Sequence, residues 1–316
     1  MKNITQPKKI LFFRLDNCLG DSIVHSFVLR ELKKLFSEAH LTVATFAPSD
    51  HFFELNPHVD KLITLPPLGP ADQPYRYFRP AILWSLLKML AHSWINHYDL
   101  VILPHTVRTP ANQLYSHLLP HMLLPPYDYT KPIQQAFVRM LKQLGAKEID
   151  TTYEFPVLSQ HKEYAQQFLQ EHGLQSDQFC VINPIGSVEY KNLSRTQIQA
   201  IIDKLHSAHI AAVLLDYKNK FADMHALIRF TSSSIFETAA LIKESSAVIS
   251  VDTGIVHLAD CFGKKLFILY PQNRQGPYNR LFWPPMHVSF HWLQSTDSVR
   301  DIPVENILSC LEKHFL

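Results

Sequence analysis

Glycine is scarce in this sequence, with only eight among 316 residues. No two glycines have the spacing of the G-x-G-x-x-G dinucleotide fingerprint or of the phosphate-binding P-loop. Both absences argue against a standard NAD site and a Walker-type ATP site. A diphosphate can still bind at a helix N-terminus, where free N–H groups and the helix dipole favour negative charge and one small residue permits close approach.

Cysteine is also rare, and long apolar runs and a large excess of charge of one sign are lacking. The four cysteines are scattered without metal-ligand spacing, which favours reduced structural thiols over a zinc site and indicates a reducing cytoplasm. The apolar run 10–13 is too short for a secretory signal, and no segment reaches the roughly 18 uncharged apolar residues of a membrane span. A net charge of +2 argues against nucleic acid as the main partner.

The sequence does contain repeated strand-like and helix-like segments, and its length and 47% hydrophobic content suit two domains. Helices are predicted at 21–36 and 81–97, and capping boxes start two more at 194–197 and 234–237. The predicted strands are 9–15, 41–46, 61–65, 100–103, 179–183, 210–215, 247–251 and 265–270. This alternation predicts an α/β protein with parallel sheets covered by helices on both faces.

The change from one α/β set to the next is expected between residues 150 and 178. We therefore predict Rossmann-like domains at 1–155 and 156–316, with the last helix, 303–316, either in the second domain or packed back on the first. Ligands of such domains bind beyond the carboxyl ends of parallel strands and at domain interfaces. The functional residues should therefore follow the strands.

One strand end reads VDTGIVHLAD, from Val251 to Asp260. Asp252 and Thr253 follow the strand, and a helix is expected to open near Gly254. The hydroxyl and free N–H groups there can face phosphate oxygens, and His257, about one turn later, can donate another hydrogen bond. The competing interpretation is that Asp252 or Thr253 only caps the helix and that His257 is a core residue.

A second strand end runs from Asn183 to Lys191. Gly186 and Ser187 can bring backbone and hydroxyl donors to the same phosphates. Lys191 can neutralise charge on a leaving diphosphate. A solvated surface lysine is the alternative.

The third strand end, Arg14 to Ser22, includes Gly20 and Asp21. Asp21 should lie in the first turn of the next helix, where the dipole favours its ionised form. An ionised carboxylate facing a cleft is a candidate general base, although acids are also common there without a function.

Four stretches together resemble glycosyltransferase family 9, the bacterial ADP-heptose:lipopolysaccharide heptosyltransferases. They are ILFFRLDNCLGDS (10–22), FFELNPHVDKLI (52–63), VINPIGS through Lys191, and ETAALIKESSAVISVDTGIVHLADCFGKKLFILY (237–270). The last stretch is the most specific, because a helix, a strand and the D-T-G-x-x-H turn follow in the family's order.

The resemblance implies a GT-B fold, in which two Rossmann-like domains face each other across a cleft. It also implies an inverting transfer that needs no metal or other cofactor, with a nucleotide sugar on the C-terminal domain and a lipopolysaccharide core acceptor on the N-terminal domain. By position, Asp21 corresponds to the base and Lys191 to a catalytic cation. The implied donor-binding residues are Gly186, Ser187, Asp216, Asp252, Thr253, Gly254 and His257.

On the acceptor side, the implied residues are Gly20, Arg76, Arg79 and Arg108, with Arg14 in a structural role. The aromatic and basic run 75–79, followed by 81–84, fits contact with the inner face of the inner membrane or with a lipid acceptor. It equally fits a core-packed helix behind a surface loop.

Two departures from the family concern the donor. Gln272 and Asn273 follow Pro271 where the family usually has glycine and a hydroxyl residue, and Asp216 stands where many members have a ribose-binding glutamate. A transferase using another nucleotide sugar therefore remains an alternative. A nucleotide-sugar epimerase and a non-catalytic protein that binds nucleotide sugar or lipid are further alternatives.

Overall fold

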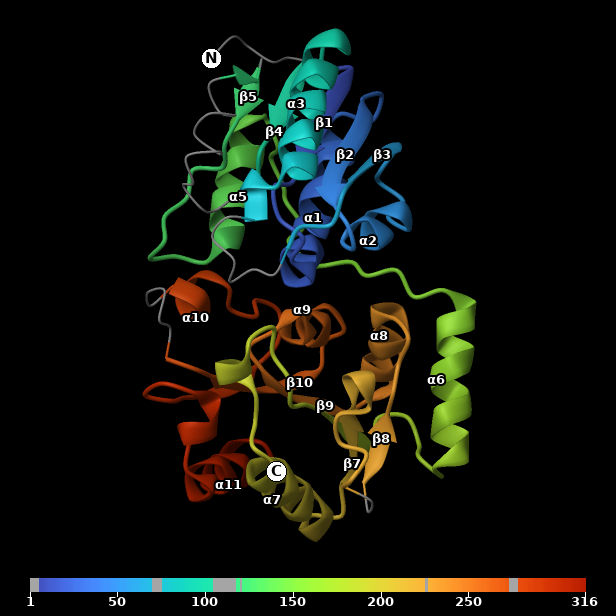
Figure 1. Cartoon of the computed structure of the whole chain (residues 1–316), viewed down its shortest axis with the longest axis vertical. Coiled ribbons are helices and arrows are strands. Elements are labelled where there is room, and N and C mark those ends of the chain that lie inside the picture. The colour runs from blue at the N-terminus through green and yellow to red at the C-terminus, as the bar shows by residue number, and fades with distance from the viewer. Residues whose placement is uncertain (1–5, 70–75, 105–117, 120, 225–226, 273–277) are drawn as a thin grey trace. The chain divides into compact units, whose positions relative to one another are not determined.

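The structure is a computed structural model that describes residues 6–69, 76–104, 118–119, 121–224, 227–272 and 278–316. The chain divides into two compact units, 1–154 and 155–316. Each unit is a parallel α/β sheet with helices on both faces (Figure 1). Arg108 lies outside the described residues, as does the side chain of Arg76.

The first unit contains a five-stranded sheet in the order β3-β2-β1-β4-β5. Its strands are β1 (Lys9–Phe13), β2 (His40–Phe46), β3 (Lys61–Leu65), β4 (Leu100–Ile102) and β5 (Met122–Leu123), and its helices are α1 (Leu19–Leu35), α2 (Asp50–Glu54), α3 (Pro80–Ile95) and α5 (Ile133–Gln143). The strands pair in parallel, with Leu11 opposite Thr42 on one side and Val101 on the other. The order reverses between β1 and β4, which is the topological switch point of a doubly wound sheet.

The two faces of this sheet are covered by different helices because successive strand side chains alternate in direction. Leu11 and Phe13 share a core cluster with Leu86 of α3. On the opposite face, Phe12 meets His25 of α1 edge to face, with 5.3 Å between ring centroids. The unit is therefore a three-layer sandwich (Figure 1).

The second unit contains a six-stranded sheet in the order β11-β10-β9-β6-β7-β8. Its strands are β6 (Phe179–Asn183), β7 (Ala211–Leu215), β8 (Ile228–Phe230), β9 (Ala247–Val251), β10 (Lys265–Tyr270) and β11 (Phe290–Gln294), and its helices are α6 (Ser159–Glu171), α7 (Arg195–Ser207), α8 (Ile235–Glu244), α9 (Gly254–Cys261), α10 (Tyr278–Phe282) and α11 (Val304–His314). The order reverses between β6 and β9, so the ends of these two strands form the switch point.

The capping boxes predicted for the second unit differ in outcome. Ser194 and Gln197 form the complete box at the start of α7. Ser234 accepts a bond from the Glu237 backbone, as predicted, but the Glu237 carboxylate turns to Ser233 instead of closing the box. The predicted start of α8 is therefore confirmed, but the predicted bond from the Glu237 side chain back to the Ser234 backbone is wrong.

The C-terminal helix α11 packs on α7 of its own unit. Ile307 and Leu311 lie in the core cluster of the second unit. The Gln197 amide donates to the carbonyl groups of Val299 and Ile302 just before α11. The apolar face of α11 is therefore used within its own unit.

Among the described residues, no helix is long and apolar enough to cross a membrane. The four cysteines, all of them among the described residues, form no disulfide bond.

Candidate functional site

The donor site predicted from the sequence coincides with the switch point of the second unit. β6 and β9 are neighbours with Asn183 opposite Ser250, so the residues that follow both strands lie at one edge of the sheet. Strand β6 leads into Gly186 and the short turn Glu189–Lys191, and β9 leads into α9. The topology thus brings together two predicted stretches that are about 65 residues apart in sequence.

An ion pair joins the two stretches. The Lys191 ammonium lies 2.6 Å from the Asp252 carboxylate, and both side chains are largely buried, with 13% and 19% of their surface exposed. The alternative of a solvated surface lysine is wrong. The pair places a cation beside the first turn of α9.

Gly186 is required by the position of Lys191. A Cβ atom at residue 186 would overlap the Cβ of Lys191, so only glycine lets the two backbone segments approach this closely. The Gly186 N–H donates to the Asn192 side chain at 2.8 Å. Gly186 therefore positions Lys191 and does not offer its own N–H to a phosphate, which corrects the role predicted for it.

Thr253 is the N-cap of α9, as the structural alternative proposed. Its hydroxyl oxygen accepts the Ile255 N–H at 3.3 Å and the Asn183 amide at 2.9 Å. These bonds occupy both acceptor positions of the oxygen, so the hydroxyl can make a further hydrogen bond only as a donor. Capping and phosphate binding are therefore compatible at this residue.

Asn183 is the residue that sequence reasoning missed at this edge. Its amide also donates to Ser250 Oγ at 3.0 Å, and the side chain is buried between β6 and β9. The sequence signal was an amide at a strand end directly before the Pro-Ile-Gly-Ser turn. No local pattern shows that it contacts Thr253.

His257 is buried in α9 and packs edge to face on Trp283, with 6.1 Å between ring centroids. Burial lowers its pKa below the ordinary 6.5, although Asp260 and Asp252 act in the opposite direction. The imidazole is therefore neutral at pH 7 and can offer one N–H as a donor.

Ser187, in contrast, is exposed and lines a cavity of about 670 Å³ together with Gly186, Arg195 and Phe221.

Asp216 does not join the predicted donor site. It has no exposed surface, and its carboxylate accepts from the Phe221 N–H and from the Arg229 guanidinium at 3.1 Å. Both contacts hold the turn after β7 in place. The prediction that Asp216 replaces a ribose-binding glutamate is corrected, because a fully enclosed carboxylate cannot contact a ligand in this conformation.

The strand end in the first unit is organised by a buried arginine. The Arg14 guanidinium donates to Asp16, to Ser22 Oγ and to the Cys18 carbonyl, and lies 5.1 Å from the centroid of the Phe53 ring. Arg14 has no exposed surface, which confirms its structural role. It fixes the turn that precedes Asp21.

Asp21 is half-buried in the first turn of α1, next to Gly20. Burial and the charge of Asp16 raise the pKa of Asp21 well above its ordinary 3.8, against the opposing charge of Arg14. The helix dipole was expected to favour the ionised form, but burial and Asp16 have the larger effect on the pKa. A carboxylate with a raised pKa is a stronger base than an ordinary aspartate.

Ligating atoms of Asp16, Cys18 and Asp21 lie within 4.8 Å of one another, which is close enough for a metal ion. The Asp16 carboxylate, however, already accepts from Arg14 and from the Cys18 N–H. The buried guanidinium charge beside it disfavours a cation. The donor set is therefore a poor fit for a metal.

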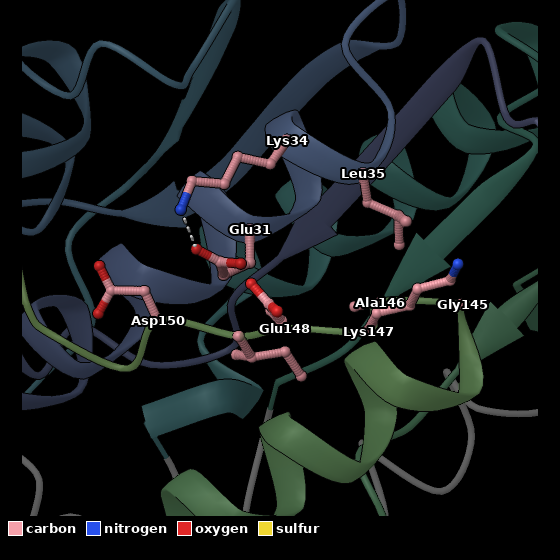
Figure 2. Close-up of a pocket in the computed structure, with 9 residues that line it drawn as sticks. Glu31, Lys34, Leu35, Gly145, Ala146, Lys147, Glu148 and Asp150 are labelled. Carbon is pink, nitrogen blue, oxygen red and sulfur yellow. Dashed lines mark hydrogen bonds and ion pairs between the residues drawn. The ribbon is translucent and has the colours of Figure 1, made fainter.

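A second cavity of about 650 Å³ lies in the first unit between the end of α1 and the segment 145–150. Figure 2 shows Glu31 and Lys34 on one side, joined by an ion pair of 2.7 Å, and Glu148 and Asp150 on the other. None of the predicted site residues lines it.

Arg79, predicted on the acceptor side, is exposed at the N-cap of α3.

A family model and a curated relative both identify heptosyltransferases as the proteins that this chain resembles. Residues 113–299 match the family described as glycosyltransferase family 9 (heptosyltransferase). A curated relative, the putative lipopolysaccharide heptosyltransferase 4 of Escherichia coli (strain K12), is 24% identical over 98% of this chain and 89% of its own length.

Solved structures show the same fold. A glycosyltransferase family 9 protein from Veillonella parvula DSM 2008 has a TM-score of 0.75 at 19% identity, covering 98% of this chain and 97% of the other. The E. coli heptosyltransferase WaaC with ADP has a TM-score of 0.66 at 14% identity, covering 96% of this chain and 99% of the other. The fold is GT-B.

We expect Asp216→Asn to lower the free energy of unfolding by about 1.5–3 kcal/mol, because it weakens a charged hydrogen bond inside the protein. The matched control is Asp223→Asn, since the Asp223 carboxylate is 67% exposed in its ion pair with Arg195 and should contribute less than about 1 kcal/mol. Urea denaturation of both variants measures the difference. Equal stability of the two variants would contradict the structural role of Asp216.

Proposed function

Because the chain belongs to glycosyltransferase family 9 (heptosyltransferase), we propose that it transfers heptose from ADP-heptose to a lipopolysaccharide core acceptor, with inversion and without a metal. The proposal assigns the donor to the second unit and the acceptor to the first. Its main support is the Lys191–Asp252 pair at the N-terminus of α9, which places a cation where a diphosphate would bind.

In the proposed reaction, an acceptor hydroxyl oxygen attacks the anomeric carbon of the donor sugar. The new C–O bond forms as the bond to the diphosphate breaks, and the bonding electron pair leaves with the diphosphate. Asp21 takes the hydroxyl proton. Attack from the side opposite the leaving group inverts the configuration at the anomeric carbon.

The leaving diphosphate gains charge during this step, and the second unit offers groups to stabilise it. Thr253 offers its hydroxyl proton, His257 a neutral N–H, and the first turn of α9 its dipole. Lys191 adds a positive charge that Asp252 holds in place before the donor binds. These contacts strengthen as charge develops, so they favour the transition state over the bound substrate.

On the acceptor side, Asp21 is the proposed base that removes the proton of the acceptor hydroxyl. The raised pKa of Asp21 makes its carboxylate more basic, and Arg14 holds the preceding turn through Asp16 and Ser22. Gly20, Arg76, Arg79 and Arg108 are proposed to bind the anionic acceptor. Family membership favours a transferase over an epimerase or a non-catalytic binding protein.

A transferase that uses another nucleotide sugar remains a second candidate, and one observation favours it. Asp216, at the position of the family's ribose-binding glutamate, is enclosed by Phe221 and Arg229. The nucleoside must therefore be recognised by other residues. The phosphate-binding groups and the base are the same under both candidates.

We expect Asp21→Asn to lower turnover by about 10²–10⁴-fold, because the amide cannot accept the hydroxyl proton. Donor affinity, measured by calorimetry, should be unchanged. Glu38→Gln, which changes an exposed acid of the same unit, serves as the control and should behave as wild type. Retention of full turnover by Asp21→Asn would remove the proposed base.

The pH profile tests the same residue independently. Activity needs ionised Asp21, so kcat/KM should fall as the pH drops through the raised pKa, at a midpoint above 3.8. Asp16→Asn removes a neighbouring negative charge and should move this midpoint to lower pH. An unshifted midpoint would show that another group controls the acid limb.

Lys191→Ala should lower turnover by about 10²-fold and donor affinity much less, since its contact strengthens as the diphosphate leaves. Gly186→Ala should reproduce this pattern by displacing Lys191. Lys243→Ala, at an exposed position on α8, is the matched control. Steady-state kinetics and donor titrations separate the two effects. Lost donor affinity with unchanged turnover would contradict the role of Lys191.

A further inference from the structure

Tyr270, the last residue of β10, has a buried hydroxyl group with no hydrogen-bond partner. Only 2% of the residue is exposed, and among the described residues none forms a hydrogen bond with this hydroxyl. Burying a hydroxyl without a partner costs free energy, so buried polar groups in folded proteins are nearly always paired. An exception at a strand end beside the proposed donor site calls for a functional explanation.

The register of the sheet places Tyr270 next to the ion pair of the donor site. Strands β9 and β10 are parallel neighbours, with Val251 opposite Leu269. Asp252 and Tyr270 each come one residue later, so they follow each other's strand at the same level of the sheet. Because neighbouring strands are about 4.8 Å apart, the two residues lie side by side at its carboxyl edge.

The Tyr270 side chain also lies on the face of the sheet that α9 covers. Phe267 and Leu269 belong to the core cluster shared with α7 and α11. Since successive side chains of a strand alternate in direction, Tyr270 projects from the other face. On that face α9 packs against β9 and β10 (Figure 1). The phenol is therefore on the same side of the sheet as the helix that the proposed donor site uses.

The charge of Asp252 acts on the phenol. Burial, and then the negative charge of Asp252, raise the pKa of Tyr270 above its ordinary 10, against the positive charge of Arg280. The phenol therefore keeps its proton at neutral pH and can donate it in a hydrogen bond to a carboxylate. Such a bond to an ionised acceptor is stronger than one between neutral groups.

A diphosphate at the start of α9 would change the surroundings of Asp252. The Lys191 ammonium lies 2.6 Å from the Asp252 carboxylate, and the proposed reaction requires the same ammonium at the leaving diphosphate. When Lys191 turns to the diphosphate, the largely buried carboxylate loses compensating charge and lies near a second anion. Both effects disfavour its ionised form. A hydrogen-bond donor already held beside Asp252 would offset them.

We infer that Tyr270 is a positioning residue of the donor site, whose hydroxyl donates to Asp252 when the diphosphate takes Lys191. The ion pair is then exchanged for two interactions, one between Lys191 and the diphosphate and one between Tyr270 and Asp252. Tyr270 acts through Asp252, because its own hydroxyl is enclosed by the protein. The inference rests on the proposed function, since the exchange needs a donor that carries a diphosphate.

The experiment compares Tyr270→Phe with wild type, because phenylalanine keeps the ring and removes only the hydroxyl. Calorimetry with ADP, and with inorganic pyrophosphate as a probe that lacks a nucleoside, should show about tenfold weaker binding of both ligands. Without ligand, the variant should be at least as stable in urea as wild type, since the hydroxyl has no bond to lose. The matched control is Tyr164→Phe, which removes an exposed hydroxyl of the same unit that donates to the Thr231 carbonyl, and it should bind both ligands as wild type does.

A double-mutant cycle shows whether Tyr270 acts through Asp252. Asp252→Ala removes the acceptor, so adding Tyr270→Phe to it should change ADP binding by less than about twofold. A crystal structure with ADP should place the Tyr270 hydroxyl about 2.7 Å from an Asp252 carboxylate oxygen. A full tenfold effect in the Asp252→Ala background would overturn the inference, because Tyr270 would then contact the donor itself.

The outcomes separate this inference from the proposed function. If wild type binds ADP or pyrophosphate and Tyr270→Phe binds it equally well, the inference fails and the proposed transfer stands. If Tyr270→Phe is much less stable than wild type without ligand, the hydroxyl has a structural role and the inference fails in the same way. If wild type binds neither pyrophosphate nor ADP, UDP or GDP, the proposed donor site fails together with the inference.

Discussion

The ion pair between Lys191 and Asp252 is the interaction on which the donor site depends. It joins the segments that follow β6 and β9, the two strands at the switch point of the second sheet. Gly186 permits the close approach of the lysine stem, and Asn183 links Thr253 to Ser250 at the same edge. The sheet order, a glycine, an amide and the ion pair together fix a cation beside a helix N-terminus, where an anion is favoured.

A buried charge has the corresponding role in the first unit. Burying Arg14 costs free energy, and Asp16, Cys18 and Ser22 offset part of this cost by accepting hydrogen bonds from its two terminal nitrogens. The turn that results places Asp21 near the negative charge of Asp16 in a poorly solvated position, which raises its pKa. The same residues thus account for the local structure and for the basicity proposed for catalysis.

The sequence predicted the architecture well because central parallel strands are buried on both faces and appear as short continuous apolar runs. Strands β5, β8 and β11 were not predicted. β5 has two residues and β8 three, and β11 includes His291 and Gln294, so none has a run of that kind. Strand ends and the switch-point rule led to Lys191, Asp252 and Thr253, because topology brings such ends together. The enclosure of Asp216 depends on Arg229 of β8, 13 residues further along the chain, which no local pattern shows. The raised pKa of Asp21 depends on its burial and on how close the turn brings it to Asp16, and the residue types of the stretch do not show either.

A calorimetric titration of the wild-type protein with ADP, adenosine, UDP and GDP, each with and without EDTA, tests the central claim most directly. If a helix terminus and Lys191 bind the diphosphate of an adenine nucleotide without a metal, ADP should bind in preference to the other three ligands. EDTA should leave that binding unchanged. Loss of ADP binding in EDTA, or equal binding of adenosine and ADP, would contradict a metal-free diphosphate site.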